Sequence, residues 1–182
     1  MRSGADCFVT SHQVPINRNQ MNKPLPTYPR ILAIAPSASG FGLAVIEGVN
    51  SLVGWEVKRM RKDMNNECMR KMEEAIGFYE PDVIVIEEGT GRSLRVRALL
   101  GRIAALGKKK GIKVAALARI EVRRLFFAEG LGSKDAMAAI LAERFPEELG
   151  RHLPPKRKEW MPEDARIAMF EAVALSLAFR KS

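Results

Sequence analysis

Three acidic residues stand where a soluble protein normally places apolar side chains. Glu87 directly follows residues 83–86, four Val and Ile residues that are typical of a strand buried on both faces. Glu171 falls inside the apolar arc that residues 167–178 form on a helical wheel, and Asp164 lies close to the same line. Because a carboxylate directed at a core is unfavourable unless it is paired or binds a metal, we expect Glu87, Glu171 and Asp164 to face one another across a cleft.

Carboxylates in such a cluster repel one another and can hold Mg²⁺ or Mn²⁺, ions that prefer oxygen ligands. Two ions of this kind can stabilise the attacking and leaving oxygens during phosphodiester hydrolysis. The alternative is that Glu87 and Glu171 form ion pairs with neighbouring arginines such as Arg92, Arg95 or Arg166. Two acids in unusual places that point to one spot favour a metal site over simple pairing.

Positive charge is concentrated just beyond the strand that carries Glu87. The chain has a net charge of +9, which favours a polyanionic partner such as nucleic acid. Only Glu121 opposes the many Lys and Arg residues of segment 92–124. For any one of these residues a solvated surface is the alternative, but the cluster as a whole indicates phosphate contacts. The residues that we expect to contact nucleic acid are Arg92, Arg95, Arg97, Arg102 and Lys134.

The elements that must position these residues follow from hydrophobic patterns and turn residues. Three strands joined by short links indicate an antiparallel meander, and later strands separated by helices indicate parallel pairing with crossover connections. The predicted strands are residues 30–36, 41–47, 52–58, 82–88 and 112–118. The predicted helices are residues 65–79, 92–110, 120–129, 133–145 and 163–179, with Asn65 and Ser133 as caps. We therefore predict an α/β fold in which strand 30–36 lies beside strand 82–88, so that Ala35 and Glu87 are neighbours.

Residues 30–182 are long enough for one domain with its own core, whereas residues 1–29 are interrupted by proline and rich in polar residues. We expect residues 1–29 to form a flexible arm. No segment approaches the roughly 20 apolar residues that a membrane span requires, and the first residues lack the pattern of a secretory signal. These features predict a cytoplasmic protein without a membrane partner.

Four segments resemble, in order and spacing, the motifs of the RuvC-type Holliday-junction resolvases, which belong to the ribonuclease H-like superfamily. The resemblance rests on Ile-Leu-Ala-Ile-Ala-Pro-Ser in the first strand, Pro-Asp-Val-Ile-Val-Ile-Glu-Glu, Gly-Ser-Lys and Glu-Ala-Val-Ala-Leu in the last helix. It covers about residues 30–180. It implies a five-stranded mixed sheet, with three antiparallel and two parallel strands, flanked by helices.

The resemblance also implies a dimer that cuts branched DNA with four carboxylates and two Mg²⁺ ions. Glu87 and Glu171 match two of those carboxylates. The first-strand aspartate of the family falls at Ala35, and another aspartate falls at Ala168, for which Asp164 is a candidate replacement. The resemblance therefore implies reduced metal occupancy and weak or absent cleavage. Ala35 is explained either by a change introduced into a nuclease or by a natural protein that binds without cutting.

Three hypotheses follow for the function. The first is a Mg²⁺-dependent endonuclease of branched DNA, inactive or weak because of Ala35. The second is a non-catalytic nucleic-acid-binding protein on the same fold. The third is a related nuclease that acts on structured RNA.

Overall fold

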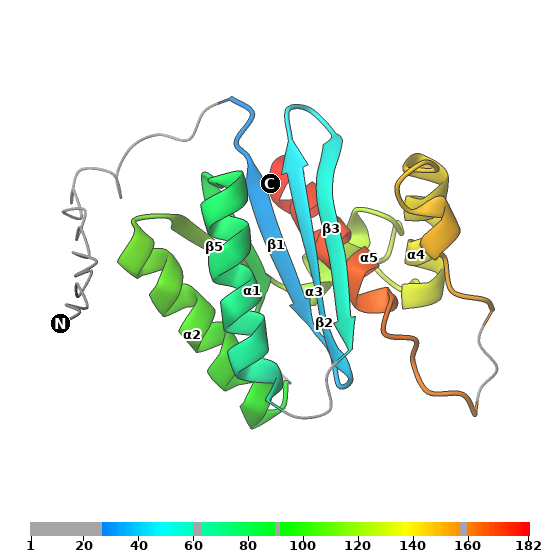
Figure 1. The fold of residues 1–182 in the computed structure, drawn as a ribbon. Coiled ribbons are helices and arrows are strands. Elements are labelled where there is room, and N and C mark those ends of the chain that lie inside the picture. The colour runs from blue at the N-terminus through cyan, green and yellow to red at the C-terminus, as the bar shows by residue number, and fades with distance from the viewer. Residues whose placement is uncertain (1–26, 60–62, 90–91, 157–159) are drawn as a thin grey trace, which may run out of the picture.

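The computed structural model describes residues 27–59, 63–89, 92–156 and 160–182, so most of the predicted arm, residues 1–26, lies outside the described part of the chain. Figure 1 shows a central sheet with helices on both sides. The strands are β1 (Ile31–Pro36), β2 (Gly40–Glu47), β3 (Ser51–Arg59), β4 (Val83–Glu87) and β5 (Lys113–Leu117). The helices are α1 (Met64–Tyr79), α2 (Leu94–Lys110), α3 (Arg119–Arg124), α4 (Lys134–Arg144), the short 3₁₀ helix η2 (Gly150–His152) and α5 (Ile167–Lys181).

The sheet has the mixed topology that the sequence predicts. Its strand order is β3-β2-β1-β4-β5, with antiparallel pairing among the first three strands and parallel pairing of β4 with both β1 and β5. Ile34 is in register with Ile86, so Ala35 and Glu87 are the next residues on adjacent strands. Glu87 is in turn in register with Leu117 on β5. The carboxyl ends of β1, β4 and β5 therefore lie side by side at one edge of the sheet.

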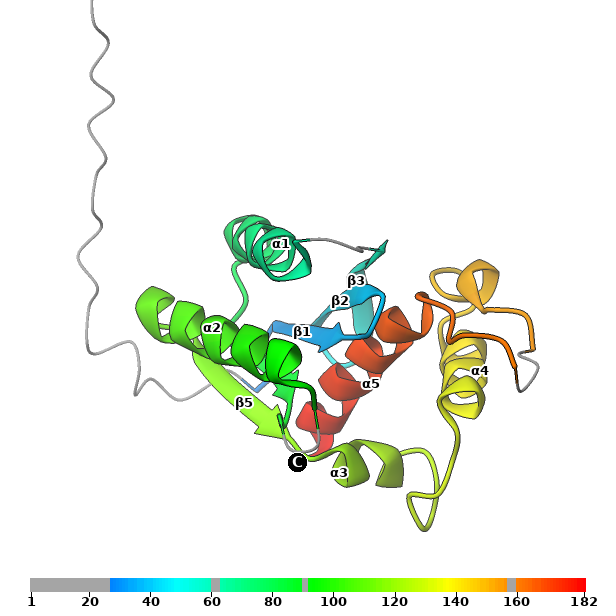
Figure 2. The ribbon, with the colours of Figure 1, turned by 90° about the horizontal axis from the view of Figure 1, so that it is seen from below.

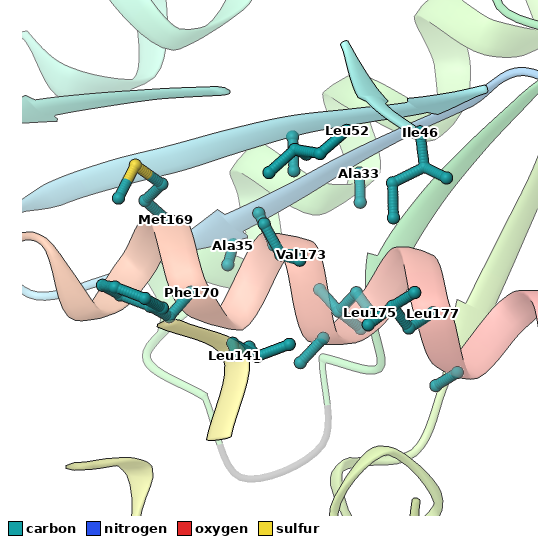
Figure 3. Close-up of a cluster of buried hydrophobic side chains, with 14 of the residues drawn as sticks. Ala33, Ala35, Ile46, Leu52, Leu141, Met169, Phe170, Val173, Leu175 and Leu177 are labelled. Atoms are coloured by element: carbon teal, nitrogen blue, oxygen red, sulfur yellow. The ribbon is translucent and has the colours of Figure 1, made fainter. Parts of the chain in front are cut away.

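Side-chain alternation divides the core into two layers, one on each face of the sheet. Helices α1 and α2 cover one face, and α5 crosses the other, with α3 and α4 beyond it (Figure 2). Leu32 and Ile34 pack in the α1–α2 layer, whereas Ala33 and Ala35 pack in the α5 layer. Figure 3 shows Ala35 in the same buried cluster as Phe170 and Val173 of α5. Glu87, which continues the alternation of β4, is directed to the α5 side.

Helix ends follow local capping chemistry, with differences from the predicted bounds. Ser133 accepts a hydrogen bond from Ala136 N at the start of α4, as predicted, but α1 begins after Asp63 and not at Asn65. The side chain of Asn65 instead donates to the carbonyl of Arg95. Helix α3 ends at Arg124, earlier than predicted.

The start of α5 differs from the prediction in a way that matters for the site. The helix begins at Ile167, so the prediction that Asp164 belongs to it was wrong. Asp164 Oδ1 accepts a hydrogen bond from the backbone N of Arg166 at 2.9 Å, which folds the chain into a turn. Short acidic side chains commonly bond to their own backbone two residues on, and this competes with helix formation.

The backbone of helix α5 lies close against Gly42 of β2. A Cβ atom at Gly42 would lie 2.2 Å from the carbonyl carbon and oxygen of Ala168. Only a glycine permits this approach between strand and helix backbones. Among the described residues, no helix combines the length and apolar character needed to cross a membrane.

Candidate functional site

Glu87 is buried at the carboxyl end of β4 and is held by two arginines. It is 7% exposed. Arg92 Nη2 lies 2.6 Å from its Oε2, and Arg119 Nε lies 2.9 Å from its Oε1. Of the arginines that the sequence offered as partners, Arg92 does pair with Glu87. Arg119, the first residue of α3, was not singled out by the sequence as a partner of Glu87. Arg119 follows β5 closely, and β5 pairs in parallel with β4, which ends at Glu87. This pairing is the signal that could have identified Arg119 as a partner.

Glu171 is buried in the second turn of α5 and is held by one lysine. It is 6% exposed, and its Oε1 lies 3.0 Å from Nζ of Lys134, the first residue of α4. Lys134 Nζ also lies 3.0 Å from Oε2 of Glu163. The second oxygen of Glu171, Oε2, is buried with no hydrogen-bond partner among the described residues. Burial raises the pKa of Glu171, and the nearby ammonium of Lys134 opposes that rise.

The two glutamates line the same small cavity, although they come from distant parts of the chain. The sequence prediction that Glu87 and Glu171 face a common space is therefore consistent with the structure. The cavity is enclosed by β4, α3, α4 and α5. Its lining residues are Glu87, Arg119, Val122, Arg123, Lys134, Met137, Glu171 and Leu175.

Asp164 does not line the cavity that Glu87 and Glu171 share. Its Oδ2 lies 2.8 Å from Arg166 Nη2, and its Oδ1 lies 3.4 Å from Arg59 Nη2. Hydrogen bonding from Arg166 lowers the pKa of Asp164 to about 2. Asp164 lines a separate pocket with Arg59, Pro162 and other residues. Asp164 lies in the turn before α5 and not in the helix. The helical alignment of Asp164 with Glu171 that the sequence predicted is therefore absent.

The positions where the resemblance implies two further carboxylates hold buried alanines. Ala35 is 1% exposed and Ala168 is fully buried. Both pack in the apolar layer between the sheet and α5. Neither can supply an oxygen ligand, and the tight contact of Ala168 with Gly42 leaves little space near the helix backbone.

The residues present do not fit the two-metal site that the resemblance implies. Two of four carboxylates are in place, and each already faces a cation from Arg92, Arg119 or Lys134. Within the described residues, no group of three or more His, Cys, Asp or Glu side chains could share a metal ion. Mg²⁺ requires near-octahedral oxygen coordination, and guanidinium and ammonium groups supply no such ligand.

The other predicted nucleic-acid contacts lie on α2. Arg95, Arg97 and Arg102 are exposed there, and Arg102 Nη1 donates to Asn66 Oδ1 at 2.9 Å. No acidic residue occurs anywhere in α2. Arg95 and Arg102 are seven residues apart and lie on the flank of α2 next to Asn65 and Asn66 of α1, whereas Arg97 lies on the opposite flank, near Gly89. Their role in binding nucleic acid stays a prediction.

Comparison with known proteins gives matches at the level of structure. Neither the protein-family models nor the curated protein sequences contain a match to this chain. Thermus thermophilus RuvC matches at 19% identity and a TM-score of 0.58, over 82% of this chain and 92% of RuvC. RuvC of the same organism in complex with a Holliday junction substrate matches at 18% identity over the same shares, with a TM-score of 0.59. The Holliday junction resolvase of fowlpox virus matches at 15% identity and a TM-score of 0.53, over 84% of this chain and 98% of the viral protein.

These likenesses agree with the strand order, the mixed pairing and the helix that crosses the sheet. They cover 92% of Thermus thermophilus RuvC and 98% of the fowlpox virus resolvase. The chain therefore has the ribonuclease H-like fold of the RuvC-type Holliday junction resolvases.

Proposed function

We propose that this protein binds branched DNA, such as a four-way junction, and that it cuts that DNA weakly or not at all. The observation that carries the proposal is the composition of the site at the end of β4. Alanine occupies positions 35 and 168, and the remaining acids, Glu87 and Glu171, are neutralised by side-chain cations.

Branched DNA is the substrate class that the fold favours. One matched structure is RuvC in complex with a Holliday junction substrate, and another is the fowlpox virus resolvase with Holliday junction DNA. The net charge of +9 and the exposed arginines of α2 suit a polyanion. We assign Arg92, Arg95, Arg97, Arg102 and Lys134 to phosphate contacts, which position a nucleic acid without reading its sequence.

Weak cleavage follows from the ligands that are missing. Two-metal hydrolysis depends on oxygen ligands to hold the ions. A bound Mg²⁺ or Mn²⁺ would activate a water for attack and stabilise the leaving oxygen. Glu87 and Glu171 are the two side chains that could contribute to holding such an ion, after release of Arg92, Arg119 and Lys134. We expect occupancy to be low with alanine at position 35.

The second candidate function is a Mg²⁺-dependent junction nuclease. The convergence of Glu87 and Glu171 on one cavity is the observation that favours it. Under this candidate, the protein as it stands cuts a four-way junction in Mg²⁺ or Mn²⁺. Under our proposal, the unaltered protein binds the junction and cuts it weakly or not at all. The Ala35→Asp variant is then expected to cut the junction faster than the unaltered protein.

Binding is tested by fluorescence anisotropy with a labelled four-way junction and a linear duplex, each titrated from low to high salt. We expect tighter binding to the junction and a linear fall of log K with log salt. A salt-insensitive or undetectable interaction would overturn the proposal. A matched RNA junction in the same assay tests the third hypothesis, and light scattering of the free and bound protein tests the expected homodimer.

A charge-matched pair of variants tests the role of the α2 arginines. Replacing Arg95, Arg97 and Arg102 by Gln removes three charges from the first half of α2. Replacing Lys108, Lys109 and Lys110 by Gln removes three charges from the last turn of the same helix, on average about 16 Å further along its axis. We expect the first variant to reduce the salt slope by about two to three, and the second to leave it nearly unchanged. Equal effects would show that binding follows net charge and not these three arginines.

A further inference from the structure

The cavity between Glu87 and Glu171 is lined by more positive than negative side chains. The cations Arg119, Arg123 and Lys134 line it together with the acids Glu87 and Glu171. Arg92 pairs with Glu87, and Glu163 pairs with Lys134, although neither of them lines the cavity. A site with this balance attracts an anion. A divalent cation would have to displace Lys134 from Glu171 and then remain beside two guanidinium groups.

The cations of this site are also positioned by their pairing and not left to move freely. Arg92 has a side chain that is 15% exposed, and Lys134 one that is 23% exposed. Glu87 holds both arginines from one side, through its two oxygens. A carboxylate in this arrangement orients guanidinium groups in advance, so that less conformational freedom is lost when a ligand binds.

Donor capacity remains for a ligand. Arg119 uses only Nε on Glu87, its side chain is 45% exposed, and its other nitrogens have no hydrogen-bond partner among the described residues. Arg92 Nε is buried and also lacks a partner within the described part of the chain. Arg119 and Lys134 line the cavity, and Arg92 is bound to the same carboxylate as Arg119. Cations in this arrangement suit the oxygens of a phosphodiester group, which accept charge-assisted hydrogen bonds.

We propose that Arg92, Arg119 and Lys134 form a phosphate-binding site that holds one backbone phosphate of the bound strand directly, without a divalent cation. The inference rests on the proposed function, because the phosphate belongs to the branched DNA. The inference goes beyond the proposed function because side-chain cations, and not metal ions, would bind the phosphate. Glu87 and Glu171 then act as positioning residues for the cations.

The first test compares junction binding in EDTA with binding in Mg²⁺ at matched ionic strength. The expected dissociation constants agree within about twofold. Mn²⁺ alone, added to the free protein and followed by electron paramagnetic resonance, is expected to stay unbound at micromolar concentrations. Junction binding that requires the metal, or tight binding of Mn²⁺ by the unaltered protein, would overturn the inference.

The second test uses two neighbouring arginines of α3. Arg119→Gln removes a cavity cation, whereas Arg124→Gln removes an exposed charge that does not line the cavity. We expect Arg119→Gln to weaken junction binding about fivefold to tenfold and to reduce the salt slope by about one, with Arg124→Gln close to the unaltered protein. Equal effects of the two variants overturn this inference but leave the proposed function standing. Absence of junction binding by the unaltered protein overturns both.

Discussion

Lys134 Nζ lies 3.0 Å from Oε1 of Glu171, while the other oxygen of that carboxylate is buried without a hydrogen-bond partner among the described residues. Lys134 is the cation that opposes the effect of burial on Glu171, which lies in a helix buried from Ile167 to Ala178. The stability of α5 against the sheet therefore depends on a residue at the start of another helix.

Lys134→Met is expected to destabilise the protein by about 2 kcal/mol, because it leaves Glu171 buried without a counter-charge. Urea unfolding at pH 7 measures the change in free energy. Combining it with Glu171→Met replaces the pair by apolar side chains of similar size and should recover most of the loss. A double variant no more stable than the single one would contradict the role assigned to this pair.

The raised pKa of Glu171 predicts how its contribution to stability changes with pH. Burial disfavours the ionised form, so the folded state is most stable while Glu171 is protonated, and stability is lost as pH rises from its ordinary pKa through the raised folded value. Glu171→Gln, which cannot ionise, should therefore be at least as stable as the unaltered protein at pH 7. That advantage should shrink as pH falls below the ordinary glutamate pKa. Paired thermal melts between pH 4 and 7 test the trend, and an advantage that grows on acidification would contradict it.

Asp164 gives the opposite pH dependence. Hydrogen bonding from Arg166 lowers its pKa to about 2, so its stabilisation is complete above its ordinary pKa near 3.8 and is lost as pH falls toward 2. Asp164→Asn is expected to cost about 1 kcal/mol at neutral pH, the size of a partly exposed charge-assisted hydrogen bond. Denaturant unfolding at several pH values measures it, with Glu147→Gln as a surface charge control. A cost that persists unchanged at pH 2 would show that the ion pair is not its source.

The contact between Gly42 and Ala168 predicts that even one methyl group at position 42 is damaging. Gly42→Ala would bring its Cβ within 2.2 Å of the Ala168 carbonyl group, and overpacking of this kind costs about 1–3 kcal/mol. Gly77→Ala is a matched control, because a Cβ at Gly77 in α1 meets nothing within 4 Å. The control should gain about 0.5–1 kcal/mol from helix propensity. Similar thermal midpoints for the two variants would contradict the packing argument.

Much of this architecture could be read from the sequence because it depends on local patterns. Four consecutive Val and Ile residues identified β4, and the strand–helix–strand order fixed its parallel pairing with β1 and β5. The placement of Glu87 followed from that pairing. The common cavity of Glu87 and Glu171 followed from the cost of burying two charges.

The parts that could not be predicted depend on contacts between distant residues. Whether Glu87 meets a metal or an arginine is decided by Arg119, which reaches it from another segment. The side chain of Asp164 accepts a hydrogen bond from the backbone N of Arg166, and the helix begins only after that turn. A helical wheel assumes that the helix is already formed, so it could not predict this hydrogen bond. The identity of the cation that faces Glu171 likewise required the position of α4 relative to α5.

Helix α5 is buried without interruption from Ile167 to Ala178, and it covers one face of a sheet whose strands all precede it in the chain. During synthesis, that face has no cover until the ribosome has released the helix. The half of the core that includes Ala35 is therefore the last to be buried. Until then its apolar side chains are exposed to solvent and available to chaperones.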